Sequence, residues 1–235
     1  MGKMRQIIRT MAVMASCLPN LGLADGNKIV VELYTSQGCS SCPPADALLA
    51  KMSKDPEILA LALHVDYWDY LGWTDKFARP AFTERQKNYA HASGERMIYT
   101  PQAIIGGKHN AVGSDAAAVM AAVMDLMQEP DLIDMRVTRS GNKAVVDAKA
   151  LLPFSGPVDV LLIRFVPEQS VEIGHGENAG LTVKYVNIVT SWTVIGAWDG
   201  LAPLQMTVPV DGADKAAIVV QAAGIGAILA AAEVP

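Results

Sequence analysis

The residues best suited to chemistry in this 235-residue chain are two cysteines in the run Cys39-Ser40-Ser41-Cys42-Pro43. They follow an apolar run at 29–34 that is typical of a strand, and a helical pattern comes after them. If the helix begins near Cys39, its unpaired N–H groups and macrodipole favour the thiolate form of that cysteine. Cys42 lies one turn later on the same face and can close a disulfide with it. The spacing therefore predicts a redox-active pair.

Two other uses of a C-x-x-C pair stay open. A zinc site needs four ligands, and the sequence has no second C-x-x-C or H-x-x-x-H pair to complete them. A purely structural disulfide is the other alternative, although such short loops are usually reducible. We expect no metal and no cofactor at this pair.

The first 24 residues predict an export signal. Basic residues and an apolar stretch lie within 3–15, and the small residues Gly22 and Ala24 suit cleavage before Asp25. This leaves Cys39 and Cys42 as the only cysteines of the mature chain and predicts a periplasmic or secreted protein. Acylation of Cys17 at a lipoprotein cleavage box stays an alternative.

Composition excludes several classes of partner. The chain is 51% hydrophobic and 18% charged, as in a well-packed globular protein. Without the first 24 residues, 16 basic residues face 24 acidic ones, so we expect no binding to nucleic acid or to anionic membranes. The apolar segment 216–234 raises the question of a membrane anchor, but two buried strands around Gly224-Ile225-Gly226 explain it better, and we expect no membrane span after signal removal.

Residues 25–130 alternate between strand and helix patterns. The expected strands and helices are 29–34, 43–52, 58–65, 77–92, 102–105, 108–112 and 116–127, in the order β-α-β-α-β-β-α. This order predicts an α/β domain with a mixed sheet flanked by helices.

Residues 131–235 change character and contain no convincing helix. Short strand patterns separated by turn residues lie at 132–139, 144–152, 158–166, 181–189, 205–210, 217–222 and 227–234. They predict an antiparallel β-sandwich domain. The junction at 127–133 is short and lacks a flexible Gly/Ser run, so we expect this domain to be fixed against the first.

Polar and aromatic residues after the strand at 58–65 form a second candidate cluster. His64, Asp66, Asp69 and Asp75 are interleaved with Trp68 and Trp73. Sites in α/β folds form at the carboxyl ends of strands, so we expect this segment to line the cysteine cleft, with Trp68 contacting substrate. A metal site built from these carboxylates is the alternative.

The strand at 29–34, the C-x-x-C pair and Thr100-Pro101 before a Gly-Gly hairpin together resemble the thioredoxin superfamily. The resemblance implies a cis proline, Pro101, beside the cysteines, and a Thr100 backbone that binds the partner segment together with Ser40 and Ser41. It also implies that Glu32 stands near the superfamily's buried acid and could accept the proton of Cys42. An outward-facing, solvated Glu32 and an ordinary trans proline are the alternatives.

Longer motifs indicate a resemblance to one particular family. The segments 35–46, 64–73, 99–102 and 176–180 are similar to those of the DUF1223 family, a group of secreted bacterial proteins with a thioredoxin-like domain and an appended β domain. The family implies a fold and a compartment but no substrate.

These observations favour a periplasmic thiol–disulfide oxidoreductase that acts on a protein or small molecule carrying a thiol or disulfide. Cys39 is the expected attacking thiolate and Cys42 the resolving thiol. Two alternatives stay open: a protein that binds copper(I) between the same cysteines, and a non-catalytic binding module on a thioredoxin scaffold.

Overall fold

The computed structural model of the protein describes residues 23–25 and 28–235. Residues 1–22 of the expected signal, which include Cys17, lie outside the described residues. The elements in chain order are β1 (Leu23–Asp25), β2 (Ile29–Thr35), α1 (Pro43–Met52), β3 (Ile58–His64), η1 (Asp69–Leu71), α2 (Pro80–Ser93), β4 (Gln102–Ile105), β5 (His109–Val112), α3 (Ala116–Leu126), β6 (Ile133–Ser140), β7 (Lys143–Ala150), β8 (Val158–Glu172), β9 (Thr182–Trp198), β10 (Leu204–Pro209), β11 (Lys215–Ala222) and β12 (Ile228–Glu233).

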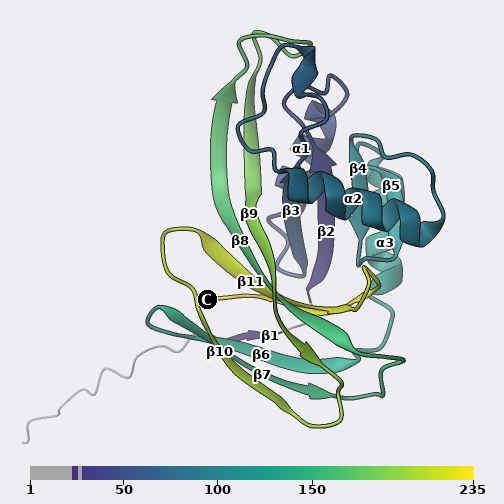
Figure 1. The fold of residues 1–235 in the computed structure, drawn as a ribbon, viewed down its shortest axis with the longest axis vertical. Coiled ribbons are helices and arrows are strands. Elements are labelled where there is room, and N and C mark those ends of the chain that lie inside the picture. The colour runs from purple at the N-terminus through teal and green to yellow at the C-terminus, as the bar shows by residue number, and fades with distance from the viewer. Residues whose placement is uncertain (1–22, 26–27) are drawn as a thin grey trace, which may run out of the picture.

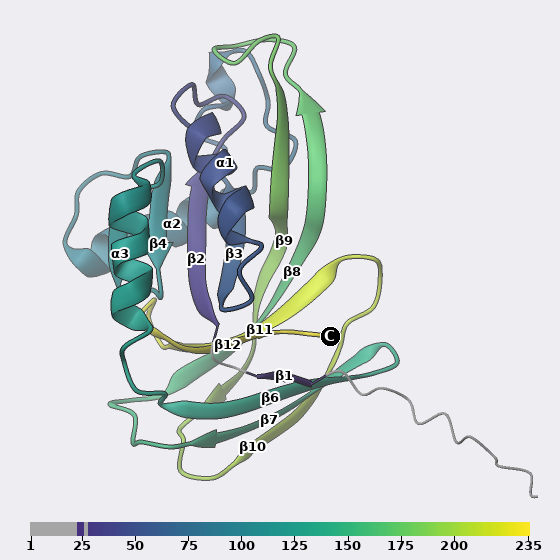
Figure 2. The same cartoon turned by 180° about the vertical axis from the view of Figure 1, so that it is seen from behind.

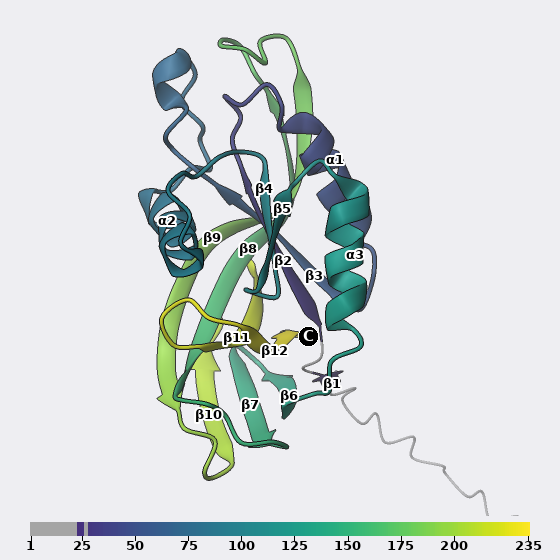
Figure 3. The ribbon, with the colours of Figure 1, turned by 90° about the vertical axis from the view of Figure 1, so that its right-hand side faces the viewer.

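A large mixed sheet of eight strands, in the order β12-β11-β8-β9-β3-β2-β4-β5, forms the centre of the molecule (Figure 1). Helices α1 and α3 cover one face of its β2–β4 part, and α2 covers the other (Figures 2 and 3). Side chains of β2 alternate between these faces, because successive residues of a strand point to opposite sides. Val30 and Tyr34 join the core under α2, whereas Val31 and Leu33 join the core under α1 and α3. The prediction of a mixed sheet flanked by helices is confirmed.

A second, antiparallel sheet has the order β1-β6-β7-β10. Ile133, Met135 and Val146 of this sheet share an apolar core with Ile218 and Val220 of β11. The alternation of buried and exposed residues along β6 and β7 is that of strands with one covered face and one solvated face.

Strands β8 and β9 are longer than the sequence pattern predicted. They have 15 and 17 residues, because their pairing continues past Pro167 through polar, exposed positions that give no apolar alternation. Strand β9 also runs parallel to β3, where Ala62 pairs with Ile188 and the Asn187 side-chain amide donates a 2.9 Å hydrogen bond to the carbonyl of Ala60. The large sheet therefore contains strands from both sides of the expected boundary at 130.

Within the described residues, no helix is both long enough and apolar enough to cross a membrane. The segment 216–234 forms strands β11 and β12, as its sequence predicted.

Candidate active site

Cys39 and Cys42 lie in the turn between β2 and α1 and are joined by a disulfide with a Cα–Cα distance of 5.4 Å. Helix α1 begins at Pro43, as the pattern at 43–52 predicted, so Cys42 rather than Cys39 is its N-cap residue. Two prolines at the first helical positions fix this start, because proline suits positions whose N–H has no helical partner. The helix N-terminus therefore adjoins Cys42, and Cys39 lies one turn before it.

The two sulfurs are covered, whereas the serines between them are exposed. Cys39 is 3% exposed and Cys42 is fully buried. The Cys39 Sγ atom lies 3.4 Å from the Ser41 hydroxyl, which also donates to the Thr100 carbonyl at 3.5 Å. Ser40 and Ser41 therefore form the exposed surface of the turn, and Cys39 becomes accessible only after local movement.

Thr100 and Trp68 lie where the sequence predicted them, beside the cysteine turn. The Trp68 indole N–H donates a 2.7 Å hydrogen bond to the Thr100 hydroxyl. The Thr100–Pro101 peptide bond is cis, as the resemblance implied. Gly38 packs against Trp68, and a Cβ at that position would lie 3.2 Å from the Trp68 Cβ. The structure therefore brings Cys39, Ser41, Thr100 and Trp68 together.

The tip of the β8–β9 hairpin lies next to the segment around η1 (Figure 1) and contacts the cysteine turn through Asn178. The buried Asn178 side chain donates hydrogen bonds of 2.9 and 2.8 Å to the carbonyls of Gln37 and Cys39. Gly176 has a φ of +79° and packs against Trp73, whose indole N–H donates to the Gln37 side chain at 2.8 Å. Asn178 lies in the segment 176–180 that carries the family resemblance, but the sequence analysis did not predict its contact with the cysteine turn.

A buried polar group lies beneath the turn. His64 Nδ1 is 2.7 Å from Asp75 Oδ2, and both side chains are fully buried. The backbone N–H groups of Gln37 and Phe77 donate to the same Asp75 carboxylate at 2.8 and 2.9 Å. Of the predicted cluster, Asp69 also joins this group through the backbone N–H of Asp75, whereas Asp66 accepts from Thr83 instead. Among the described residues, no three metal-binding side chains lie close enough to hold an ion.

Asp46 is the residue of this group that sequence reasoning missed. It is buried on α1 one turn after Cys42, and burial raises the pKa of its carboxyl to about 7, against the opposing effect of His64. Thr35 lies close to Asp46, yet neither carboxylate oxygen has a hydrogen bond of normal geometry. The available signal was a lone acidic residue four positions after Cys42, in a helix whose other charged residue is Lys51 in the last turn.

Glu32 is buried, so the outward-facing, solvated alternative is wrong, but its carboxylate is already paired with Arg85. It is fully buried, and Arg85 of α2 donates to both carboxylate oxygens at 2.8 and 2.9 Å. The hydroxyls of Tyr34 and Tyr89 donate to the same oxygens at 2.9 and 2.8 Å. A carboxylate held by four donors is a poor acceptor for a cysteine proton. The expectation that Glu32 takes the proton of Cys42 therefore loses its geometric support.

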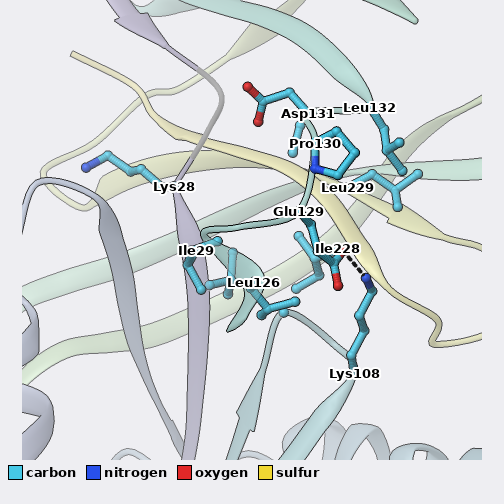
Figure 4. A pocket seen from close by; sticks show the side chains of 13 residues that line it. Lys28, Ile29, Lys108, Leu126, Glu129, Pro130, Asp131, Leu132, Ile228 and Leu229 are labelled. Carbon is cyan, nitrogen blue, oxygen red and sulfur yellow. Dashed lines mark hydrogen bonds and ion pairs between the residues drawn. The ribbon is translucent and has the colours of Figure 1, made fainter. Parts of the chain in front are cut away.

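A hollow of about 80 Å³ lies at the other end of β2, away from the cysteines (Figure 4). It is lined by Ile29, by the junction between α3 and β6, and by β12, and the ion pair of Lys108 with Glu129 lies beside it (Figure 4). The hollow has no cysteine or histidine and takes no part in the candidate site.

The comparisons with known proteins cover the part of the chain that carries the cysteine turn. Residues 30–222 match the family model described as "Protein of unknown function (DUF1223)", so the chain belongs to the DUF1223 family. A crystal structure of a protein from Agrobacterium tumefaciens is similar, with 33% identity, a TM-score of 0.76, and coverage of 88% of this chain and 93% of that chain. HBP35 of Porphyromonas gingivalis shares the fold at 14% identity and a TM-score of 0.56, over 88% of this chain and 74% of that chain. A search of curated proteins finds no match.

Proposed function

We propose that this protein is a thiol–disulfide oxidoreductase that uses the Cys39–Cys42 pair. The observation that carries the proposal is the position of this pair, in a turn between a central strand and a helix with exposed serines and the Thr100 carbonyl beside it. A disulfide that serves only to staple the fold has no need of such an approach. The Thr100 carbonyl and the exposed serines are the polar groups that an extended partner segment would bind.

The exchange follows from the positions of the two sulfurs. A substrate thiolate attacks Cys39 Sγ, the Cys39–Cys42 bond breaks, and the electron pair leaves on Cys42. A second substrate thiolate then attacks the substrate sulfur of the mixed disulfide and releases Cys39. The substrate dithiol is oxidised to a disulfide, and the two cysteines are reduced to thiols. In the opposite direction, Cys39 attacks a substrate disulfide and Cys42 resolves the mixed disulfide.

The architecture we propose is a thioredoxin-like arrangement of residues 25–130 and a β-sandwich built from 131–235, with β8 and β9 shared between them. The compartment we propose is the periplasm or the exterior, because residues 1–24 have the pattern of an export signal. The partner is a protein or small molecule carrying a thiol or disulfide.

Exchange kinetics with single-cysteine variants test this function. The full chain should open its disulfide in dithiothreitol and catalyse reduction of a disulfide-bonded protein such as insulin. Cys39→Ser should abolish catalysis, and Cys42→Ser should accumulate a mixed disulfide through Cys39. The double variant Cys39→Ser/Cys42→Ser gives the uncatalysed rate, and a wild-type rate no higher than it would overturn the proposal. Titration of the reduced protein with copper(I) tests the metal-binding alternative on the same samples.

A further inference from the structure

A second hollow, of about 450 Å³, lies between α2 and β9 and beside the turn that joins β11 to β12. Its volume falls within the range of roughly 300–1,000 Å³ that is usual for sites that bind small molecules. Neither cysteine lines it, so it is separate from the candidate active site. The residues that line this hollow indicate what kind of molecule would fit there.

The walls of the hollow are mainly apolar and include two aromatic rings. Phe82 comes from α2, Trp192 from β9 and Ile225 from the β11–β12 turn. The Trp192 ring is held in place by the Arg85 guanidinium, which lies 3.8 Å from the ring centroid and is itself paired with Glu32. The Trp192 indole N–H is buried and has no hydrogen-bond partner in the described part of the chain. A rigid aromatic wall with an unused donor suits a flat ring that carries an acceptor.

Ile225 lines the hollow in a strained conformation. Its φ is +68°, in the left-handed region that β-branched residues rarely adopt. The turn is held by two hydrogen bonds: the Gln221 side-chain amide donates to the Gly226 carbonyl at 2.8 Å, and the Gly226 N–H donates to the Ala222 carbonyl at 3.0 Å. Strained residues of this kind are concentrated at ligand-binding and other functional sites. The strain at Ile225 is therefore a second observation that points to a ligand in this hollow.

The charged residues of the lining favour an anion. Arg85 is already paired with Glu32, and Glu84 lies 3.7 Å from Lys87. Arg79 also lines the hollow, and among the described residues no carboxylate pairs with its guanidinium. The uncompensated charge of the hollow is therefore positive, although the whole chain carries a net charge of −5.

We propose that this hollow binds a small aromatic anion, with its ring against Phe82 and Trp192 and its carboxylate or sulfonate group at Arg79. The aromatic wall accounts for the ring, and the unpaired guanidinium accounts for the charge. This binding activity goes beyond the proposed thiol–disulfide exchange and does not depend on it.

Two related dyes test the inference by fluorescence titration of the full chain. Anilinonaphthalenesulfonate is an aromatic anion, and phenylnaphthylamine has the same rings without the charge. We expect saturable binding of the anionic dye at one site per chain. The variant Cys39→Ser/Cys42→Ser should bind it equally well, so failure of the proposed exchange leaves this test intact. Loss of binding in that variant would place the dye at the cysteine turn and overturn the inference.

A charge variant tests the role of Arg79. Arg79→Gln should weaken binding of the anionic dye about 5- to 10-fold and leave binding of the neutral dye unchanged. Arg136→Gln, at an exposed position on β6, is the matched control and should change neither. Unchanged affinity of Arg79→Gln for the anionic dye would overturn the choice of an anion.

A filling variant tests the location of the site. Thr193 is exposed on β9 and lines the hollow, so Thr193→Phe should abolish binding of both dyes without unfolding the chain. Thr207→Phe, at an exposed position on β10, is the matched control. Wild-type affinity in Thr193→Phe would overturn the inference. Light scattering that shows a dimer of the wild type and a monomer of Thr193→Phe would also overturn it, because a second copy of the chain would then occupy the hollow.

Discussion

The Asp46 carboxyl makes the stability of this protein depend on pH. Burial raises its pKa from 3.8 to about 7 in the folded chain, whereas the unfolded chain ionises at the ordinary value. Between these values the unfolded chain binds fewer protons, so the free energy of unfolding falls as pH rises. The loss begins near pH 4 and is complete above pH 7. Each pKa unit corresponds to about 1.4 kcal/mol, which gives a total of about 4 kcal/mol.

Denaturant unfolding of the oxidised protein at several pH values measures this dependence. Asp46→Asn cannot titrate, so its stability should stay level from pH 4 to pH 7 where that of the wild type falls. The two curves should differ most in slope between these pH values and run parallel above pH 8. Parallel curves over the whole range would mean that Asp46 is already ionised in the folded protein at pH 4.

Side chains also show where sequence reasoning succeeds and where it stops. The sequence predicted that Cys39, Thr100 and Trp68 lie near one another, because each of them belongs to a local motif. Asp46 was missed because a short, alanine-rich helix has no clear apolar phase, and its buried face proved to be Ala45, Asp46, Leu49 and Met52. The environment of Glu32 depends on Arg85, which lies 53 residues away, and no local pattern reports such a pairing.

Among the elements, the β8–β9 hairpin contacts the cysteine turn from outside the first half of the chain. Its Asn178 amide holds two carbonyls of the cysteine turn, and Cys39 is almost fully covered. Asn178→Ala removes these hydrogen bonds, and we expect it to destabilise the closed position of the hairpin tip by about 1–2 kcal/mol. We expect the alkylation rate of Cys39 in the reduced protein to rise about 5- to 30-fold, because opening of the tip becomes easier by that factor.

Iodoacetamide labelling followed by mass spectrometry gives this rate. Glu177→Ala is the matched control, because Glu177 is the exposed neighbour of Asn178 on the same tip. Equal labelling rates in the wild type and Asn178→Ala would show that Cys39 is reached by another route.

The β8–β9 hairpin was predicted only in part from the sequence. Sequence patterns located the strands of the second half, because apolar alternation is a local property. They placed the ends of β8 and β9 too early and gave no sign that β9 pairs with β3. Pairing between distant strands depends on edges and registers that only the folded chain brings together.

In the whole molecule, the two halves are joined through the large sheet and through one buried network. Arg85 of α2 binds Glu32 of β2, donates to Gln221 of β11 at 3.0 Å, and lies 3.8 Å above the ring of Trp192 in β9. Without the second half, Arg85 loses the Gln221 acceptor and the packing of the Trp192 ring. The second half therefore supports the cysteine half as well as covering it.

A fragment spanning residues 25–129 tests this dependence. It lacks β9, Trp192 and Gln221, so the edge of β3 and the Arg85 network would be exposed to water. We expect the fragment to aggregate, or to lose the near-ultraviolet dichroism and the cooperative unfolding of the full chain. A soluble fragment with a sharp unfolding transition would show that the first half folds by itself.

The central place of β9 has a consequence for the nascent chain. Strand β3 ends at His64 and β9 begins at Thr182, so about 118 residues must be synthesised between them. At about 5–20 residues per second, the ribosome needs roughly 6 to 24 s for this stretch. During that time the β3 edge has no partner and is open to other chains, including chaperones. The hairpin tip with Asn178 emerges at the end of the same interval, so a disulfide formed during synthesis is made before the hairpin covers it.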